Sequence, residues 1–436
     1  MREIEPHRLE QHVVRLANVI GPRLAGSEAE SAAAAYVAGT FREAGGRVNV
    51  ETFAVGSRRI ESQSLAFEID GTWRETPCSV ISGSRGTGGE PVEAPVTIVE
   101  PPSLRRPSYD GLAGKAVLLL ATHVEDPEHY RRLMAARPAF LILVDVRYPS
   151  DDVRADGLFP AYVHRYGAVP TVSIPYMRAW ALHDPNGRPR SARLRITGGT
   201  VASSSQNVIA ELPADDGSAG PVIYATAHHD TQADSPGADD NATGVAALLE
   251  LARVLAPEPR RRAVRLISFG TEEQLSVGSA SYVRAHRGEL ERRGGYVCNF
   301  DSFGSRMGWF NVSTCLESAS ADRVRAYLDE RGQYAELSNE VSPYQDAFPF
   351  HAAGIGGHWV YRRNCTAGRF FHHQRDDEPD KLDFAMMAPM VAAHAGMIAE
   401  WSQAETLPVS HAVPAGLRDA IERYWTDCFG GWAGFG

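Results

Sequence analysis

Short apolar runs alternate with helix-like segments in the second half of the chain, and their order predicts the main fold. The apolar runs cover residues 222–227, 264–269 and 296–300, while apolar positions recur at helical spacing over 243–255 and 279–290. Strands and helices that alternate in this way predict an α/β fold, with a mostly parallel or mixed central sheet covered by helices on both faces. Ligands in such sheets bind at the carboxyl ends of the strands.

The first half of the chain contains two regions with different hydrophobic patterns. Residues 8–45 show helical spacing interrupted at Gly21-Pro22, which predicts two helices, and residues 48–52 alternate like a strand. Residues 58–203 instead contain short apolar runs separated by Gly and Pro, which predict a strand-rich module. We therefore expect a larger domain formed by residues 1–57 and 204–436, with 58–203 inserted as a smaller domain.

Composition narrows the classes of partner. The 436 residues carry 44 basic and 54 acidic side chains, for a formal charge of -10, and these are mixed along the chain. A nucleic-acid or anionic-membrane partner is not expected, because such surfaces favour concentrated Lys and Arg. The N-terminus has no basic leader followed by an apolar stretch, and no segment has the length needed to span a bilayer, so a cytoplasmic protein is expected.

The five cysteines are widely spaced and form no CxxC pair. Neither a disulfide framework nor a thiolate zinc site is therefore indicated. If this chain binds a metal, its ligands are expected to be His, Asp and Glu.

Residues able to bind metals follow each of the three predicted strands. Asp230 closes a His-His-Asp sequence after the first strand, and Asp240 follows in a Gly-containing loop. Glu272-Glu273 follow the second strand and Asp301 the third. Taken singly, each of these groups has a common structural explanation: a hydrogen-bonded His–Asp pair, an acidic helix cap or two solvated glutamates. Together they predict one cation site, because several unpaired carboxylates at the buried end of a sheet are costly without a cation.

The residue types suit two zinc ions. Two His and three carboxylates leave an open position for water, and a pair of metals needs a short bridging carboxylate, which Asp240 can supply. Of the adjacent glutamates, one can ligate while the other faces the water. Asp240, Glu273 and Asp301 bring three negative charges against the four of two zinc ions, and Glu272 makes the site neutral.

These residues, in this order, resemble the two-zinc aminopeptidase family that also contains glutamate carboxypeptidase II and the glutaminyl cyclases. The resemblance rests on AHHDTQADSPGADDNATGVAALLELARVL, ISFGTEEQLSVGSASYV, CNFDSFG and FHHQRDDEPDKLD, with GPRLAGSEAE near the N-terminus. The inserted module, with GLAGKAVLLL and VPTVSIP, resembles a protease-associated domain.

The resemblance assigns a role to each site residue and makes residues 1–57 and 204–436 the catalytic zinc peptidase domain. It implies that Glu272 is the general base, that Asp230 orients a metal-bound imidazole, and that His372 stabilises the transition state, although a packing role for His372 is an equal alternative. The spacing to Asp377 and Asp380-Lys381 selects His373 over His372 as a ligand. The implied metal ligands are His228, Asp240, Glu273, Asp301 and His373.

The implied activity is that of a zinc-dependent exopeptidase, most simply an aminopeptidase that acts on peptides. A carboxypeptidase or dipeptidase of the same family is the alternative, with Arg362, Arg363 or Arg369 receiving the substrate carboxylate. A non-catalytic receptor-like protein is disfavoured because all five ligands and the base are present. At Gln274-Leu275-Ser276 the sequence departs from the family pattern, so the wall of the substrate pocket is expected to differ from that of the family. The residue preference, the native metal and a homo-oligomeric state are left open.

Overall fold

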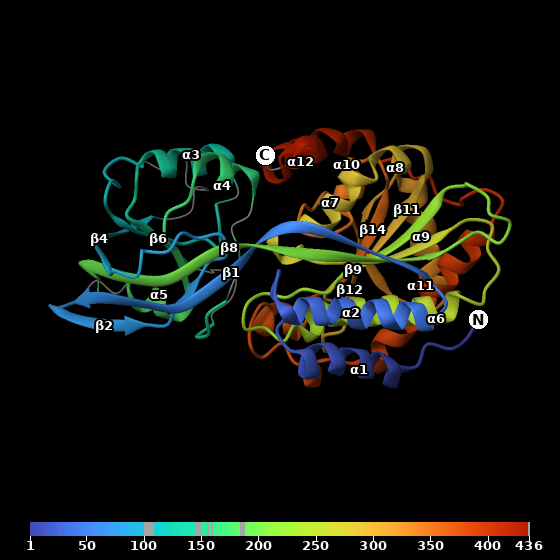
Figure 1. Cartoon of the computed structure of the whole chain (residues 1–436), viewed down its shortest axis with the longest axis horizontal. Coiled ribbons are helices and arrows are strands. Elements are labelled where there is room, and N and C mark those ends of the chain that lie inside the picture. The colour runs from blue at the N-terminus through green and yellow to red at the C-terminus, as the bar shows by residue number, and fades with distance from the viewer. Residues whose placement is uncertain are drawn as a thin grey trace. The chain divides into compact units, whose positions relative to one another are not determined.

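The computed structural model describes residues 1–99, 109–124, 126–144, 150–154, 157, 160–183 and 188–434, except the side chains of residues 367 and 369. The chain divides into two compact units (Figure 1). The first contains Met1–Val55 and Ser203–Trp432, and the second contains Gly56–Ala202 and Ala433–Gly436. The identity of the second unit as a protease-associated domain stays a prediction.

A mixed sheet forms the centre of the first unit, with strand order β13-β12-β14-β11-β9-β10 followed by β8. Its middle strands β14, β11, β9 and β10 run parallel to one another, whereas β12 and β8 pair in the antiparallel sense with β14 and β10. The predicted α/β fold with a mixed central sheet is therefore confirmed. The bounds are β8 Ser191–Leu212, β9 Val222–His228, β10 Val264–Phe269, β11 Gly294–Phe300, β12 Trp309–Cys315, β13 Ala335–Asn339 and β14 Gly357–Arg363.

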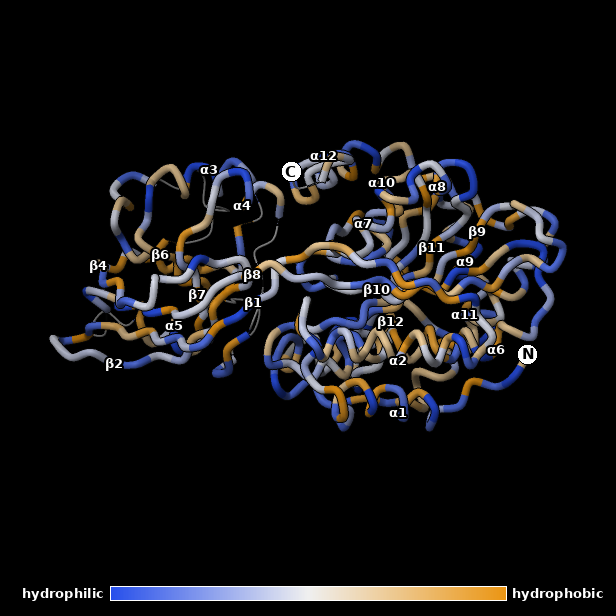
Figure 2. Tube along the Cα trace, in the orientation of Figure 1, coloured by the Kyte–Doolittle hydropathy of each residue, from blue (hydrophilic) through white to orange (hydrophobic). Residues whose placement is uncertain are grey.

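Helices cover both faces of this sheet (Figure 1). One face packs against α1 (Pro6–Val14), α2 (Glu28–Glu43), α6 (Thr243–Leu255), α9 (Ser318–Glu330) and α11 (Phe384–Gln403), whose apolar side chains form the larger core cluster. The other face packs against α7 (Val277–Ala285), α8 (Arg287–Arg293) and α10 (Phe348–Ala352), with α12 (Arg418–Phe429) stacked on α10 through Phe348 and Phe429. In Figure 2 hydrophobic colour follows the central strands and the helices beside them.

Some element boundaries predicted from the sequence are wrong. The predicted helix over 279–290 is two helices, because His286 leaves helical geometry with φ -103 and ψ 12 between α7 and α8. The strand predicted over 48–52 is the beginning of the longer strand β1 (Arg47–Ile69), and the single strand β8 continues across residue 203, where the sequence predicts the end of the inserted module.

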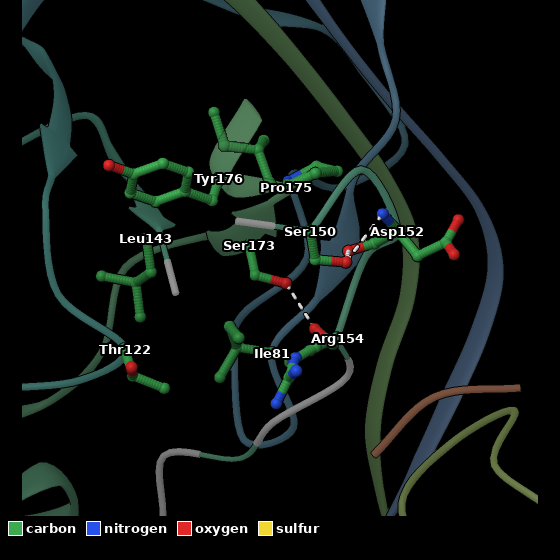
Figure 3. A pocket seen from close by; sticks show the side chains of 10 residues that line it. Ile81, Thr122, Leu143, Ser150, Asp152, Arg154, Ser173, Pro175 and Tyr176 are labelled. Carbon is green, nitrogen blue, oxygen red and sulfur yellow. Dashed lines mark hydrogen bonds between the residues drawn. The ribbon is translucent and has the colours of Figure 1, made fainter. Parts of the chain in front are cut away.

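The second unit has its own small core around β4 (Val92–Val99), β5 (Ala116–Leu119), β6 (Phe140–Val144), β7 (Thr171–Ile174) and β3 (Ser79–Val80). Figure 3 shows a small cavity beside the ends of β6 and β7, where Ser173 Oγ donates to the carbonyl of Arg154 at 2.7 Å. None of the predicted site residues lines this cavity. Among the helices in the described ranges, none combines the length and the apolar character that crossing a membrane requires.

Candidate active site

The carboxyl ends of neighbouring parallel strands bring the predicted ligands to one edge of the sheet. In the register of β9 and β10, His228 pairs with Phe269, so the segment with Glu272 and Glu273 leaves the sheet beside His228. Asp301 directly follows β11, which lies on the other side of β9. Residues distant in the sequence meet here because parallel strands end at the same edge.

Asp240 lies between two groups of side chains, and each of its carboxylate oxygens faces one group. Oδ1 lies 3.1 Å from His228 Nε2, which is also 3.4 Å from Asp301 Oδ1. Oδ2 lies 3.3 Å from His373 Nε2, which is also 3.1 Å from Glu273 Oε2. The other four predicted ligands therefore lie around the Asp240 carboxylate, and the five residues form two sets of three that share Asp240.

The donor atoms fit a pair of cations. His228 is buried, and its Nε2 lies between two carboxylate oxygens, 3.1 Å from Asp240 Oδ1 and 3.4 Å from Asp301 Oδ1. Its ligand atom and those of Asp240 and Asp301 lie within 4.8 Å of one another, as do those of Asp240, His372 and His373. Imidazole nitrogens and carboxylate oxygens are ligands that zinc binds readily. The residues present therefore suit zinc on both sides of Asp240.

The backbone around Asp240 is fixed by buried polar groups. Gly237 adopts φ +59, and a Cβ there would lie 2.4 Å from the Asp240 carbonyl oxygen, so the turn requires glycine. The backbone N–H groups of Asp239 and Asp240 donate to the two oxygens of Asp377 at 2.9 and 3.1 Å. The Asp240–Asn241 peptide is cis, and Asn241 Oδ1 accepts a bond from the first turn of α6 at 2.8 Å. The main chain on both sides of Asp240 is thus held by hydrogen bonds to Asp377 and Asn241.

Asp230 holds the glutamate pair in a similar way. Its two carboxylate oxygens accept the backbone N–H groups of Glu272 and Glu273 at 2.9 and 3.2 Å. Its carbonyl oxygen lies 3.2 Å from His228 Nδ1 and its Oδ1 lies 3.4 Å from the same atom. Asp230 therefore contacts the imidazole that the sequence predicts it to orient, and it also clamps the turn that carries the base.

Glu272 and His372 border the two sets of ligands. Glu272 Oε2 lies 3.9 Å from His228 Nε2. His372 Nδ1 lies 3.0 Å from Asp240 Oδ2, and its ring stacks on His373 with centroids 3.6 Å apart. The His372 side chain keeps 27% of its surface exposed, so a substrate can reach it. The structure places both predicted catalytic side chains beside the candidate metal positions.

Burial and like charges shift the pKa of nearly every acid in this cluster. Burial is the main cause that raises the pKa of Glu272 well above its usual range and that of Glu273 to about 7. Burial also raises the pKa of Asp301, whereas hydrogen bonds from His228 and the two later histidines outweigh burial and lower the pKa of Asp240. Burial alone would lower the pKa of His228, but Asp301, Asp230 and Asp240 raise it well above its usual value. Positive charge would stabilise the ionised form of these clustered carboxylates, and divalent cations can supply it.

Comparison with known protein families finds a match in this part of the chain. Residues 207–397, which include all eight predicted site residues, match the model of peptidase family M28. The stretch that matches this model is named the M28 domain. Aminopeptidase YwaD of Bacillus subtilis is 28% identical to the chain over 354 residues, which are 79% of this chain and 72% of that protein.

Two further likenesses extend beyond the M28 domain. Probable lipoprotein aminopeptidase LpqL of Mycobacterium tuberculosis is 26% identical over 289 residues, which are 65% of this chain and 55% of that protein. The crystal structure of BSAP, a zinc aminopeptidase from Bacillus subtilis, matches with a TM-score of 0.76 at 23% identity, covering 95% of this chain and 100% of that chain. This last likeness shows a shared fold.

Two residues that support the M28 site were not predicted from the sequence. In the sequence, Asp377 only supplies the spacing that selects His373. In the structure, its carboxylate accepts hydrogen bonds from the backbone N–H groups of Asp239 and Asp240. Arg23, outside the M28 domain, is buried, and burial lowers its pKa to about 10 against the opposing effect of nearby carboxylates. It donates to the main-chain carbonyls of Leu16, Gly21, His229, Pro236 and Gly237. The segment GPRLAGSEAE was the available signal for Arg23, but no sequence pattern shows that its partners are carbonyls.

Proposed function

We propose that this chain is a zinc aminopeptidase that removes the N-terminal residue of peptides, using two zinc ions held on either side of Asp240. The observation that carries the proposal is that the two oxygens of the Asp240 carboxylate face different sets of ligands, Oδ1 toward His228 and Oδ2 toward His373. A carboxylate in this position can bridge two metals about 3.5 to 4 Å apart. The M28 domain and the relatives named as aminopeptidases support the same activity.

Each ligand belongs to one side of the proposed pair. His228 and Asp301 would hold the first ion, Glu273 and His373 the second, and Asp240 both. When bound, the ions would supply an acidified water and a Lewis acid for the scissile carbonyl. The protein contributes the rigid placement of these ligands through the main-chain clamps at Asp240 and at the glutamates.

Glu272 is the proposed general base and then the general acid. Its Oε2 faces the metal side of the site, 3.9 Å from His228 Nε2, where the attacking water would lie. One carboxylate oxygen can take the proton of that water and then deliver it to the leaving amine. His372, partly exposed beside Asp240, is the proposed hydrogen-bond donor to the carbonyl oxygen of the substrate as negative charge develops there.

The alternative of a carboxypeptidase needs a basic side chain to receive a substrate carboxylate. Arg362 instead donates to the carbonyls of Met307 and Gly308 at 2.5 and 2.7 Å. Arg363 lies 3.7 Å from the carboxylate of Glu336 and 4.0 Å from that of Glu340. The side chain of Arg369 lies outside the described part of the chain. The two described arginines have partners within the protein, which favours the aminopeptidase.

The test compares free and blocked substrates with a variant of the base. Purified zinc-loaded protein is assayed with aminoacyl p-nitroanilides and with the same compounds acetylated at the amine. We expect turnover of the free amines only, and a fall in kcat of about 10²- to 10⁴-fold in Glu272→Gln with both metals retained. Equal turnover of blocked and free substrates would contradict the aminopeptidase, and a fully active Glu272→Gln would contradict the role of the base.

A further inference from the structure

The turn that carries Glu272 has a backbone that few sequences adopt. Thr271, Leu275 and Ser276 have φ values of +60, +68 and +48, all in the left-handed region. Residues other than glycine are uncommon there, and they persist only where the surrounding structure holds them. This turn includes the segment Gln274-Leu275-Ser276, where the sequence departs from the family pattern.

Asn207 on β8 holds the two ends of this turn. Its Oδ1 accepts the backbone N–H of Gly270 at 3.3 Å, and its Nδ2 donates to the carbonyl of Gly278 at 2.9 Å. A Cβ on Gly278 would lie 2.1 Å from the Gly270 carbonyl oxygen, so the ends approach as closely as glycine allows. The turn is therefore closed on itself, and its left-handed residues are held by packing and hydrogen bonds.

Ser276 uses this geometry to reach back to the proposed base. The Ser276 side chain is buried, and its Oγ donates to Glu272 Oε1 at 3.1 Å. Its backbone N–H donates to the Glu272 carbonyl at 2.6 Å. Ser276 thus contacts both the main chain and the side chain of Glu272, while Glu272 Oε2 is the oxygen that faces His228.

A second layer fixes Ser276 in turn. Ser279 Oγ lies 2.6 Å from Asp346 Oδ1 and 3.2 Å from the Ser276 carbonyl oxygen, and all three residues are buried. The Ser276 hydroxyl therefore sits on a segment that is held from both sides. Such support matters because a free glutamate side chain rotates about several bonds, and misplacing a base by about 1 Å can cost roughly 10²-fold in rate.

We propose that Ser276 is a positioning residue that fixes Oε1 of Glu272, so that Oε2 is aimed at the reacting water. The inference rests on the proposed function, since it assigns Glu272 the role of base. Ser276 acts through Glu272, whose Oε1 accepts its hydroxyl at 3.1 Å.

The test uses two substitutions that remove the same hydroxyl but differ in the backbone. Ser276→Gly relieves the left-handed conformation, whereas Ser276→Ala retains its strain. Met307→Gly is the control, because it relieves an exposed left-handed residue, with φ +63, that lies outside this turn, and it leaves the hydroxyl in place. Kinetics of aminoacyl p-nitroanilide hydrolysis and zinc content are measured for each protein at saturating zinc.

We expect kcat to fall about 10- to 100-fold in both Ser276 variants, with KM and zinc content within about twofold of the wild type, and no such fall in Met307→Gly. Full kcat in Ser276→Gly would overturn the inference, as would a loss confined to Ser276→Ala or one explained by lost zinc. If the wild type itself hydrolyses no free-amine substrate, the proposed function fails instead, so the two failures are distinguishable.

Discussion

Asp240 is the residue whose ionisation the whole site requires. Three histidines contact its carboxylate and, against the effect of burial, keep its pKa well below the usual range. The sequence could indicate Asp240 because a short acid between a glycine-containing loop and a helix suits a bridge. It could not indicate Asp377, whose partners are main-chain N–H groups that any residue carries.

Replacing Asp377 tests the main-chain clamp at the scale of one residue. In Asp377→Asn, one of the two accepting oxygens is replaced by an NH₂ group, which cannot accept a hydrogen bond. One of the backbone N–H groups of Asp239 and Asp240 then loses its acceptor, and this part of the main chain is less firmly held. We expect a loss of about 10- to 100-fold in zinc affinity or kcat, which is typical when groups that orient metal ligands are removed. Zinc titration and steady-state kinetics measure this.

The neighbouring Asp376 provides the control. It is exposed, so Asp376→Asn makes the same chemical change without touching the clamp. Equal losses in the two variants would mean that net charge, and not the clamp, is responsible.

At the scale of elements, the hydrophobic pattern was a good guide where strands are short and buried on both faces. The ranges 264–269 and 243–255 predicted from the pattern coincide with β10 and α6. The pattern failed at His286, where apolar spacing continues although the backbone leaves the helix between α7 and α8. It also failed for β1 and β8, because these long strands pair with strands distant in the chain, β1 with β8 and β8 with β4.

The junction of α1 and α6 illustrates a contact that no local pattern predicts. Glu250 on α6 is buried, and its Oε1 accepts from Arg8 at 2.9 Å and from Arg253 at 2.8 Å. His12 Nε2 lies 3.9 Å from the same oxygen. These partners outweigh burial and lower the pKa of Glu250 from 4.5 to about 2.

We therefore expect Glu250 to stabilise the fold in a pH-dependent way. Because its folded pKa is the lower one, its contribution is fully present above pH 4.5 and is lost as the pH falls toward about 2. Glu250→Gln should lower the free energy of unfolding at pH 7 by about 1.5 to 3 kcal/mol, the usual worth of hydrogen bonds to a charged group. Urea unfolding measures the difference.

Repeating the urea unfolding at low pH tests whether the ionised carboxylate of Glu250 is the source of the stability difference. The difference between Glu250→Gln and the wild type should shrink as the pH falls below 4.5, whereas Glu10→Gln, an exposed change on α1, should stay within about 0.5 kcal/mol of the wild type throughout. A difference that does not depend on pH would exclude the ionised carboxylate as its source.

At the scale of the whole molecule, the metals and the fold of the first unit should be linked. Without cations, the carboxylates of Asp240, Glu272, Glu273 and Asp301 crowd one buried edge of the sheet. Metals that bind the folded state alone stabilise it, by roughly 2.7 kcal/mol at a hundred times the Kd. Exhaustive chelation should therefore lower the melting temperature, and added zinc should restore it, as calorimetry can show. Melting that stays unchanged after confirmed metal removal would contradict this linkage.

The most direct test of the account is a crystal structure of the zinc-loaded protein with anomalous scattering measured at the zinc edge. We predict two peaks on opposite sides of the Asp240 carboxylate, one beside His228 and Asp301 and the other beside Glu273 and His373. A zinc-containing crystal with these five side chains unliganded, or with a single ion in contact with all of them, would contradict the two-metal site.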